Sequence, residues 1–159
     1  MNKTGVIYGI NGPVVYLKGN TGFKMSEMVY VGKERLVGEV IALTKDTTTV
    51  QVFEETTGLK PGETVTASGD ALSVTLGPGI LNNIFDGIER PLSEIAKQSG
   101  KYISRGLTVD SLDTEKKWDV HVTVSEGEEL MGGAIIAETQ ETRSIVHKSM
   151  VPPDVNGTV

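Results

Sequence analysis

The chain has 159 residues, of which 15 are basic and 21 acidic, giving a formal net charge of −6 at pH 7. This balance argues against a sequence-independent nucleic-acid surface or an anionic-membrane surface. The absence of cysteine excludes disulfides, thiolate metal sites and a cysteine nucleophile. The chain has only two histidines, His121 and His147, and two histidines without cysteine make a structural metal site unfavourable. No run approaches the roughly 20 apolar residues that a bilayer crossing requires. We therefore expect a cytoplasmic protein of one ordinary or two small domains, without membrane insertion.

Short runs of β-forming residues, separated by turn residues, fill the first part of the chain. In the run 48–53, Val50 and Val52 alternate with Thr49, Gln51 and Phe53, as in a half-buried strand. Gly38 inside the run 36–43 predicts a bulge or corner. Six strands in so short a span predict a closed barrel without open edges. The predicted strands are 6–8, 14–17, 28–31, 36–43, 48–53 and 64–67.

The pattern changes after Gly69. A Gly77-Pro78-Gly79 break precedes apolar residues at helical spacing, which predict a short amphipathic helix over 80–88. Pro91 then suits the first turn of a second helix over 92–98, which Gly100 would end.

β character returns from Trp118, beyond a predicted boundary near 107–114. Val120, Val122 and Val124 alternate with polar residues and predict a half-buried strand, and 135–138 and 145–150 are further strand candidates. Thr158-Val159 would begin a strand without a later partner, so we expect a truncated and frayed module. The predicted fold is mainly β: a six-stranded N-terminal barrel (1–70), a short helical connector (71–110) and a small β-rich, barrel-sandwich-like bulge module (111–159).

Two Gly-Lys pairs are the candidates for a phosphate loop. Such a loop needs Gly, four residues, then Gly-Lys-Ser/Thr, and neither Gly32-Lys33-Glu34 nor Gly100-Lys101-Tyr102 fits. These pairs are interpreted as a turn and a helix stop, and Gly77-Pro78-Gly79 as a structural turn rather than an anion site. The sequence therefore predicts no nucleotide site in this chain.

Clustered carboxylates could serve acid–base catalysis or bind a hard cation. Each cluster has a turn-like or alternating polar context, which favours solvated faces. We expect no catalytic, cofactor-binding or metal-binding residues. The clusters are Glu54-Glu55, Glu126-Glu128-Glu129 and Glu138-Glu141.

Lys148 raises an alternative. Segments 125–137, 147–150 and 156–159 resemble a biotinyl or lipoyl carrier module, which exposes one lysine at a hairpin tip. Here His147 and Ser149 flank Lys148 within a strand-like run, which favours a shared β architecture over modification. A carrier or β-rich adaptor stays open as the alternative function.

Several blocks together resemble one family. In order along the chain they are similar to the N-terminal part of the catalytic A subunit (alpha chain) of V-type and archaeal-type (A-type) rotary ATPases and ATP synthases. The blocks 85–92 and 151–153 are specific. Segments 105–107, 116–118 and 147–153 resemble the inserted bulge region, and 84–92 resembles part of the segment that leads into the nucleotide domain. The remaining blocks are 12–15, 37–41, 51–63 and 72–81.

The resemblance implies a place in an ion-translocating machine. A and B subunits would alternate in an A3B3 ring held by a crown of barrels, and the bulge would contact peripheral stalk subunits. ATP and Mg²⁺ would bind the parent subunit outside this chain, which ends at Val159 without a phosphate loop. The chain would be peripheral to the membrane, in the soluble ATPase sector. Whether H⁺ or Na⁺ is moved, and whether ATP is made or consumed, stays open.

Overall fold

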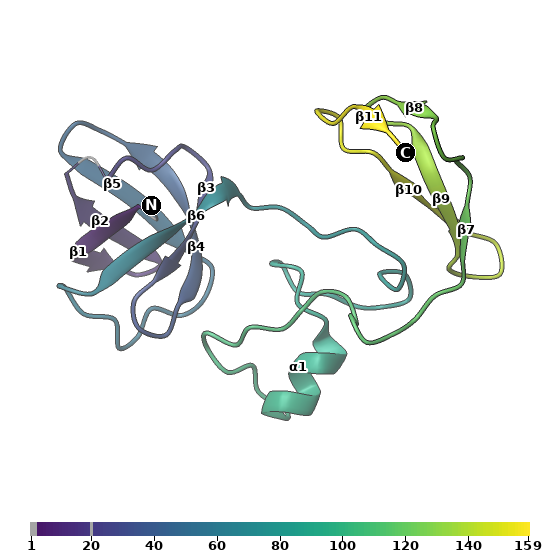
Figure 1. Ribbon diagram of the computed structural model, residues 1–159. Helices are drawn as coiled ribbons and strands as arrows, with labels where there is room; N and C mark the ends of the chain where they lie inside the picture. Colours follow the sequence, from purple (N-terminus) through teal and green to yellow (C-terminus); the bar gives the residue numbers. More distant parts are fainter. Residues whose placement is uncertain (1–2, 20) are drawn as a thin grey trace. The chain divides into compact units, whose positions relative to one another are not determined.

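The computed structural model describes residues 3–19 and 21–159, which divide into two compact units (Figure 1). Unit 1 holds the described residues up to Val74 together with Ser99–Thr108. Unit 2 holds Thr75–Gln98 and Val109–Val159. The backbone therefore passes between the units after Val74, Gln98 and Thr108.

Unit 1 is built on the predicted closed barrel. Neighbouring strands follow the order β1-β2-β5-β4-β3-β6, and β6 pairs with β1 to close the ring. All the pairings are antiparallel. Closure pairs the backbone groups that an open sheet would leave at its edges. The strands are β1 (Thr4–Asn11), β2 (Val14–Lys18), β3 (Glu27–Val31), β4 (Leu36–Leu43), β5 (Thr47–Val52) and β6 (Thr64–Ala71).

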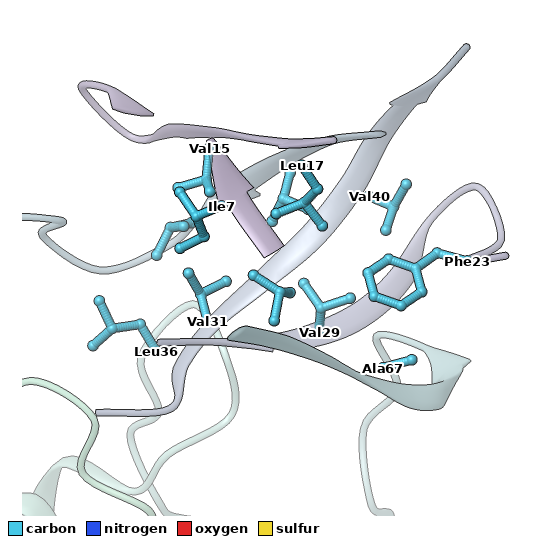
Figure 2. Packing of buried hydrophobic residues seen from close by; sticks show 12 residues of the cluster. Ile7, Val15, Leu17, Phe23, Val29, Val31, Leu36, Val40 and Ala67 are labelled. Carbon is cyan, nitrogen blue, oxygen red and sulfur yellow. The ribbon is translucent and has the colours of Figure 1, made fainter. Parts of the chain in front are cut away.

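Most buried side chains of the barrel are apolar, and valine is the commonest among them (Figure 2). Strand β5 shows why: Val50 and Val52 point inward and are buried, whereas Gln51 is exposed, which confirms the predicted alternation. Short branched side chains fill a narrow barrel without voids. The buried cluster is Ile7, Val15, Leu17, Phe23, Val29, Val31, Leu36, Val40, Val50, Val52, Val65 and Ala67. Glu27 of β3 and Thr48 of β5 are buried as well.

The bulge predicted at Gly38 lies elsewhere. Gly38 pairs regularly with Val52, and the register shifts between Val40 and Ala42, so Ile41 is the extra residue. Gly38 is required for close approach instead, because a Cβ there would lie 2.7 Å from the backbone oxygen of Gln51.

The first helix predicted in the connector is wrong. Residues 80–88 contain turns at 81–82 and 87–88 and a β-bridge from Phe85 to Pro91. Asn82 has a φ of 66°, which a helix does not allow. The second helix is confirmed as α1 (Leu92–Ser99); it buries Ile95 and is followed by Gly100 at φ 73°. None of the described helices has the length and apolar composition needed to cross a bilayer.

Two small sheets complete unit 2 and confirm the mainly β fold. One has the order β10-β9-β7 and the other pairs β11 with β8. Their strands are β7 (Val120–Val122), β8 (Glu129–Leu130), β9 (Ile135–Gln140), β10 (Val146–Met150) and β11 (Gly157–Thr158).

Two expectations for this region are corrected. Val120 and Val122 are 56% and 61% exposed, so β7, which lies at the sheet edge, buries neither of its faces. Thr158 is also paired, with Glu129, and Val159 exchanges backbone hydrogen bonds with Gly127 and Glu128. The partner strand comes from earlier in the chain, which removes the reason for expecting a frayed end.

Candidate interaction surfaces

An exposed aromatic patch lies on the outside of the barrel. Tyr8 is the extra residue of a bulge in β1, because Ile7 pairs with Leu17 while Gly9 pairs with Tyr16. Tyr8 and Val6 are 52% and 53% exposed, and the Tyr8 and Tyr16 rings lie 6.2 Å apart. We call Val6, Tyr8 and Tyr16 the Tyr8 face. Aromatic and aliphatic side chains of this kind are typical of protein interfaces.

A second exposed apolar surface lies on unit 2. Val120 and Val122 stand on β7, opposite Thr139 and Ala137 of β9. Within the described chain the other edge of β7 has no partner strand. We call Val120 and Val122 the β7 face. An edge strand with exposed valines can bind a neighbouring protein.

Lys148 does not lie at a hairpin tip. It stands within β10 opposite Glu138, with Nζ 3.9 Å from Glu138 Oε1, and the chain reverses at 141–145. His121 pairs with Glu138, whereas His147 pairs with the next residue, Thr139, so the two imidazoles lie on opposite faces of the sheet. The geometry that a carrier lysine requires is therefore missing, and the histidines are not brought together.

The Gly77-Pro78-Gly79 turn binds a carboxylate side chain of its own unit, that of Glu141. Glu141 Oε1 accepts hydrogen bonds from the N–H groups of Gly79 (2.8 Å) and Leu81 (3.0 Å). Asn83 Nδ2 donates to the Gly79 carbonyl at 2.7 Å. The N–H groups of Gly79 and Leu81 are therefore occupied by a side chain of the same unit, and Glu141 departs from the predicted solvated face. Its partners are 62 and 60 residues away in the chain, so no local sequence pattern marks the contact.

Members of the other predicted carboxylate clusters also make separate contacts. Glu54 is half-buried and accepts the Gly106 N–H at 2.9 Å, so it too departs from the predicted solvated face. Glu55 accepts the Thr57 hydroxyl, and Glu128 accepts the Ser125 N–H at 3.0 Å. Each of these three carboxylates accepts a hydrogen bond from a different backbone or side-chain donor. Among the described residues, no group of three His, Asp or Glu side chains is arranged to hold a metal ion.

Both Gly-Lys pairs occupy the local structures predicted for them. Gly32, at φ 71°, begins the β3–β4 turn, and the Lys33 N–H donates to Glu63 Oε2 at 3.0 Å. Gly100 follows α1 with φ 73°. These backbones form a turn and a helix end.

Asp86 and Arg90 close a tight loop ahead of α1. Asp86 Oδ1 accepts the N–H groups of Ile88 (3.1 Å) and Arg90 (2.9 Å), and Oδ2 lies 2.8 Å from Arg90 Nε. Burial raises the pKa of Asp86, but the hydrogen bonds from Arg90 and Ile88 and the charge of Arg90 together outweigh it and hold the pKa below its ordinary value of 3.8. The loop is therefore pinned by an ionised carboxylate.

A polar hollow of about 460 Å³ lies beside α1 in unit 2. Lys97 Nζ is 2.6 Å from Glu94 Oε1, and this hydrogen bond, with the charges of Glu94 and Asp113, raises the pKa of Lys97. Lys116 lies 3.9 Å from the centre of the Trp118 ring. The Lys97 ammonium is therefore paired with Glu94, and the Lys116 ammonium lies over the Trp118 ring.

Comparison with known proteins assigns both folded parts to one family. Residues 7–69 match the model of the ATP synthase alpha/beta family, beta-barrel domain, and residues 109–159 match that of the ATPsynthase alpha/beta subunit barrel-sandwich domain. The chain belongs to the ATP synthase alpha/beta family.

Relatives within the ATP synthase alpha/beta family are similar over the whole chain. The V-type ATP synthase alpha chain of Halothermothrix orenii is 51% identical over all 159 residues. The A subunits of the A-type ATP synthases of Methanosphaera stadtmanae and Methanopyrus kandleri are 51% and 52% identical over 98% of the chain. The chain spans only 26–27% of the length of these relatives. The resemblance to the N-terminal part of the A subunit is confirmed.

Two contacts of this ATP synthase alpha/beta family chain were not predicted from its sequence. Arg105 and Gly106 contact barrel loops, and Glu141 holds the 77–81 turn. In the sequence, Arg105 and Gly106 stand out only as part of a block that resembles the family. Glu141 stands out only as a member of a carboxylate cluster that is expected to be solvated. Both lie in loops, where spacing carries no periodic signal.

Proposed function

We propose that this chain serves as the non-catalytic N-terminal part of the A subunit of an ion-translocating V/A-type rotary ATPase. In this proposal the barrel helps to assemble the A3B3 ring, and the barrel-sandwich module contacts peripheral stalk subunits. The observation that carries it is the identity of about half the residues, over the whole chain, to V-type ATP synthase alpha chains and to A subunits of A-type ATP synthases. The two family domains also occur in order.

The barrel suits a role between B subunits in the ring. It is closed, so none of its six strands offers an open edge, and its packed interior makes a stiff body. A specific interface buries on the order of 800 Å² per partner. The Tyr8 face supplies exposed aromatic and aliphatic side chains for such a contact.

The barrel-sandwich module suits a contact with the peripheral stalk. Its β7 face exposes Val120 and Val122, and these side chains lie beside the unpaired edge of β7 within the described chain. An edge strand can pair with an extended segment of a partner while its valines pack against it.

ATP and Mg²⁺ belong, in this proposal, to the rest of the subunit. Phosphoryl transfer needs a phosphate cradle, a Mg²⁺ ligand and a positioned water, and the sequence contains no phosphate-loop motif. The isolated chain should neither bind nor hydrolyse ATP. In the machine it would be peripheral to the membrane, within the soluble sector, on its cytoplasmic side.

The assembly role can be tested in a full-length A subunit that carries this sequence. The double variant Val6→Asp, Tyr8→Asp should lower the yield of A3B3 ring in native mass spectrometry at least tenfold. The double variant Val120→Asp, Val122→Asp should leave the ring intact but abolish capture of stalk subunits. Each variant controls for the other. Full ring yield with the first, or full stalk capture with the second, would refute the corresponding half of the proposal.

The non-catalytic role is tested by titrating the isolated chain with Mg-ATP in a calorimeter. No heat of binding and no phosphate release are expected. Micromolar binding or magnesium-dependent turnover would overturn it.

A further inference from the structure

Residues 99–108 return to the barrel after the chain has left it. Strand β6 runs from Val65, which faces Val31, to Ala71, which faces Glu27. The chain therefore leaves the barrel at the Glu27 end. Ser99–Thr108 nevertheless belong to unit 1, and Arg105 and Gly106 make polar contacts with loops at the opposite end, beyond Val31.

One guanidinium joins two of these loops. Arg105 Nη1 donates to the carbonyls of Thr57 and Glu55, the latter at 3.3 Å, both in the segment between β5 and β6. Arg105 Nη2 lies 3.3 and 3.2 Å from the two carboxylate oxygens of Glu34, in the β3–β4 turn. A planar guanidinium can hold such divergent acceptors at once, whereas a lysine ammonium is a single point charge.

The next residue fixes the same segment through its backbone. The Gly106 N–H donates to Glu54 Oε2 at 2.9 Å. Gly106 has φ 65°, and a Cβ there would lie 2.1 Å from the backbone oxygen of Glu34. Only glycine permits this approach.

The contact between Arg105 and Glu34 is ionic and partly open to water. The side chains of Arg105 and Glu34 are 33% and 50% exposed. Ion pairs at such exposure are weakened by dissolved salt, because counterions screen them. By contrast, the barrel strands are joined by backbone ladders around a buried cluster of apolar side chains.

We propose that Arg105 and Gly106 form a clasp that holds residues 99–108 as a strap across the loop end of the barrel, and that screening of its ionic contacts opens the strap. With the clasp closed, Thr108 is held at this end of the barrel, and residues 109–159 start from there. With the clasp open, only the chain passage after Val74 still joins unit 2 to the barrel. The clasp thus sets how many chain passages tether unit 2 to the barrel.

The proposal is tested by hydrogen–deuterium exchange on the whole chain. Arg105→Ala should speed exchange of peptides covering 99–108 and 53–59 at least tenfold while leaving β4 (36–43) unchanged. Arg105→Lys should restore the protection only in part, because an ammonium cannot hold both loops. Lys101→Ala, which alters an exposed side chain of the same segment, is the matched control and should change nothing.

A second variant and a salt series test the roles of Gly106 and of the ionic contact separately. Gly106→Ala should open the strap as Arg105→Ala does. Raising NaCl from about 0.05 to 1 M should speed exchange of the strap several-fold in the wild type but not in Arg105→Ala, because the screened contact is then already lost. Unchanged exchange of 99–108 in Arg105→Ala would overturn the clasp. Equal loosening of β4 would also overturn it, since Arg105 would then stabilise the whole barrel.

Discussion

Several carboxylates in this chain accept hydrogen bonds from backbone N–H groups in loops. Asp86 holds the 86–90 loop, Glu141 the 77–81 turn, Glu54 the Gly106 N–H and Glu63 the N–H groups of Lys33 and Lys60. Hydrogen bonds to an ionised group are stronger than neutral ones. Long segments without regular structure can therefore keep one conformation.

Asp86 gives the first prediction at this scale. Its pKa in the folded chain lies below the ordinary value of 3.8, so its ionised form favours folding. The contribution is complete above about pH 4 and is lost as the pH falls through the folded-state pKa. Asp86→Asn should lower the free energy of unfolding of unit 2 at pH 7 by about 1.5–3 kcal/mol, and the difference from wild type should shrink in acid.

Urea unfolding followed by Trp118 fluorescence, from pH 7 to pH 2, measures this difference. Asp119→Asn removes an exposed carboxylate and serves as the control. A difference that stays constant down to pH 2 would show that the charge of Asp86 is not the cause.

Glu141 gives the second prediction. Glu141→Ala leaves the N–H groups of Gly79 and Leu81 without their acceptor, which should cost about 1–3 kcal/mol. Exchange of the Gly79 and Leu81 amides, followed by NMR, should accelerate, whereas Glu126→Ala, at an exposed glutamate, should leave both unchanged. Unaltered protection of these amides in Glu141→Ala would mean that the turn is stable without the Glu141 carboxylate.

At the scale of elements, the barrel strands depend on inward-pointing side chains. Leu36 at the start of β4 is fully buried, whereas Val6 on β1 is 53% exposed. Leu36→Ala should lower the free energy of unfolding of the barrel by about 2–5 kcal/mol, and Val6→Ala by less than about 0.5 kcal/mol. Thermal unfolding followed by circular dichroism distinguishes them. Similar losses of unfolding free energy in the two variants would contradict the assignment of Leu36 to the barrel interior and Val6 to its outer surface.

The same elements explain which parts of the fold the sequence could predict. Alternation around Val50 and Val52 identified β5, because a strand repeats every two residues and only one face is buried. Ile80, Leu81 and Ile84 mimic helical spacing, but Ile84 is 74% exposed and the backbone is held by Asp86 and by Glu141. Periodicity reports burial only where one face is buried. Contacts across dozens of residues, such as those of Glu141 and Arg105, leave no local pattern.

At the scale of the whole molecule, the two units differ in the cores that they bury. The barrel packs a cluster of 12 residues, whereas the buried apolar side chains among the described residues of unit 2 are Pro91, Ile95 and Ala137. Hydrophobic burial is the main favourable contribution to folding. Unit 2 depends relatively more on its loop carboxylates, and its free energy of unfolding should be smaller.

Calorimetry of the chain should therefore show two transitions, the lower belonging to unit 2. A single two-state transition is expected only of one cooperative domain. Ile95→Ala should lower the midpoint of the first transition alone, because it removes the buried side chain of α1. Leu36→Ala should lower only the second, which gives each variant a matched control. One transition that both variants shift equally would show instead that the units unfold together, and the smaller core of unit 2 would then not set its stability.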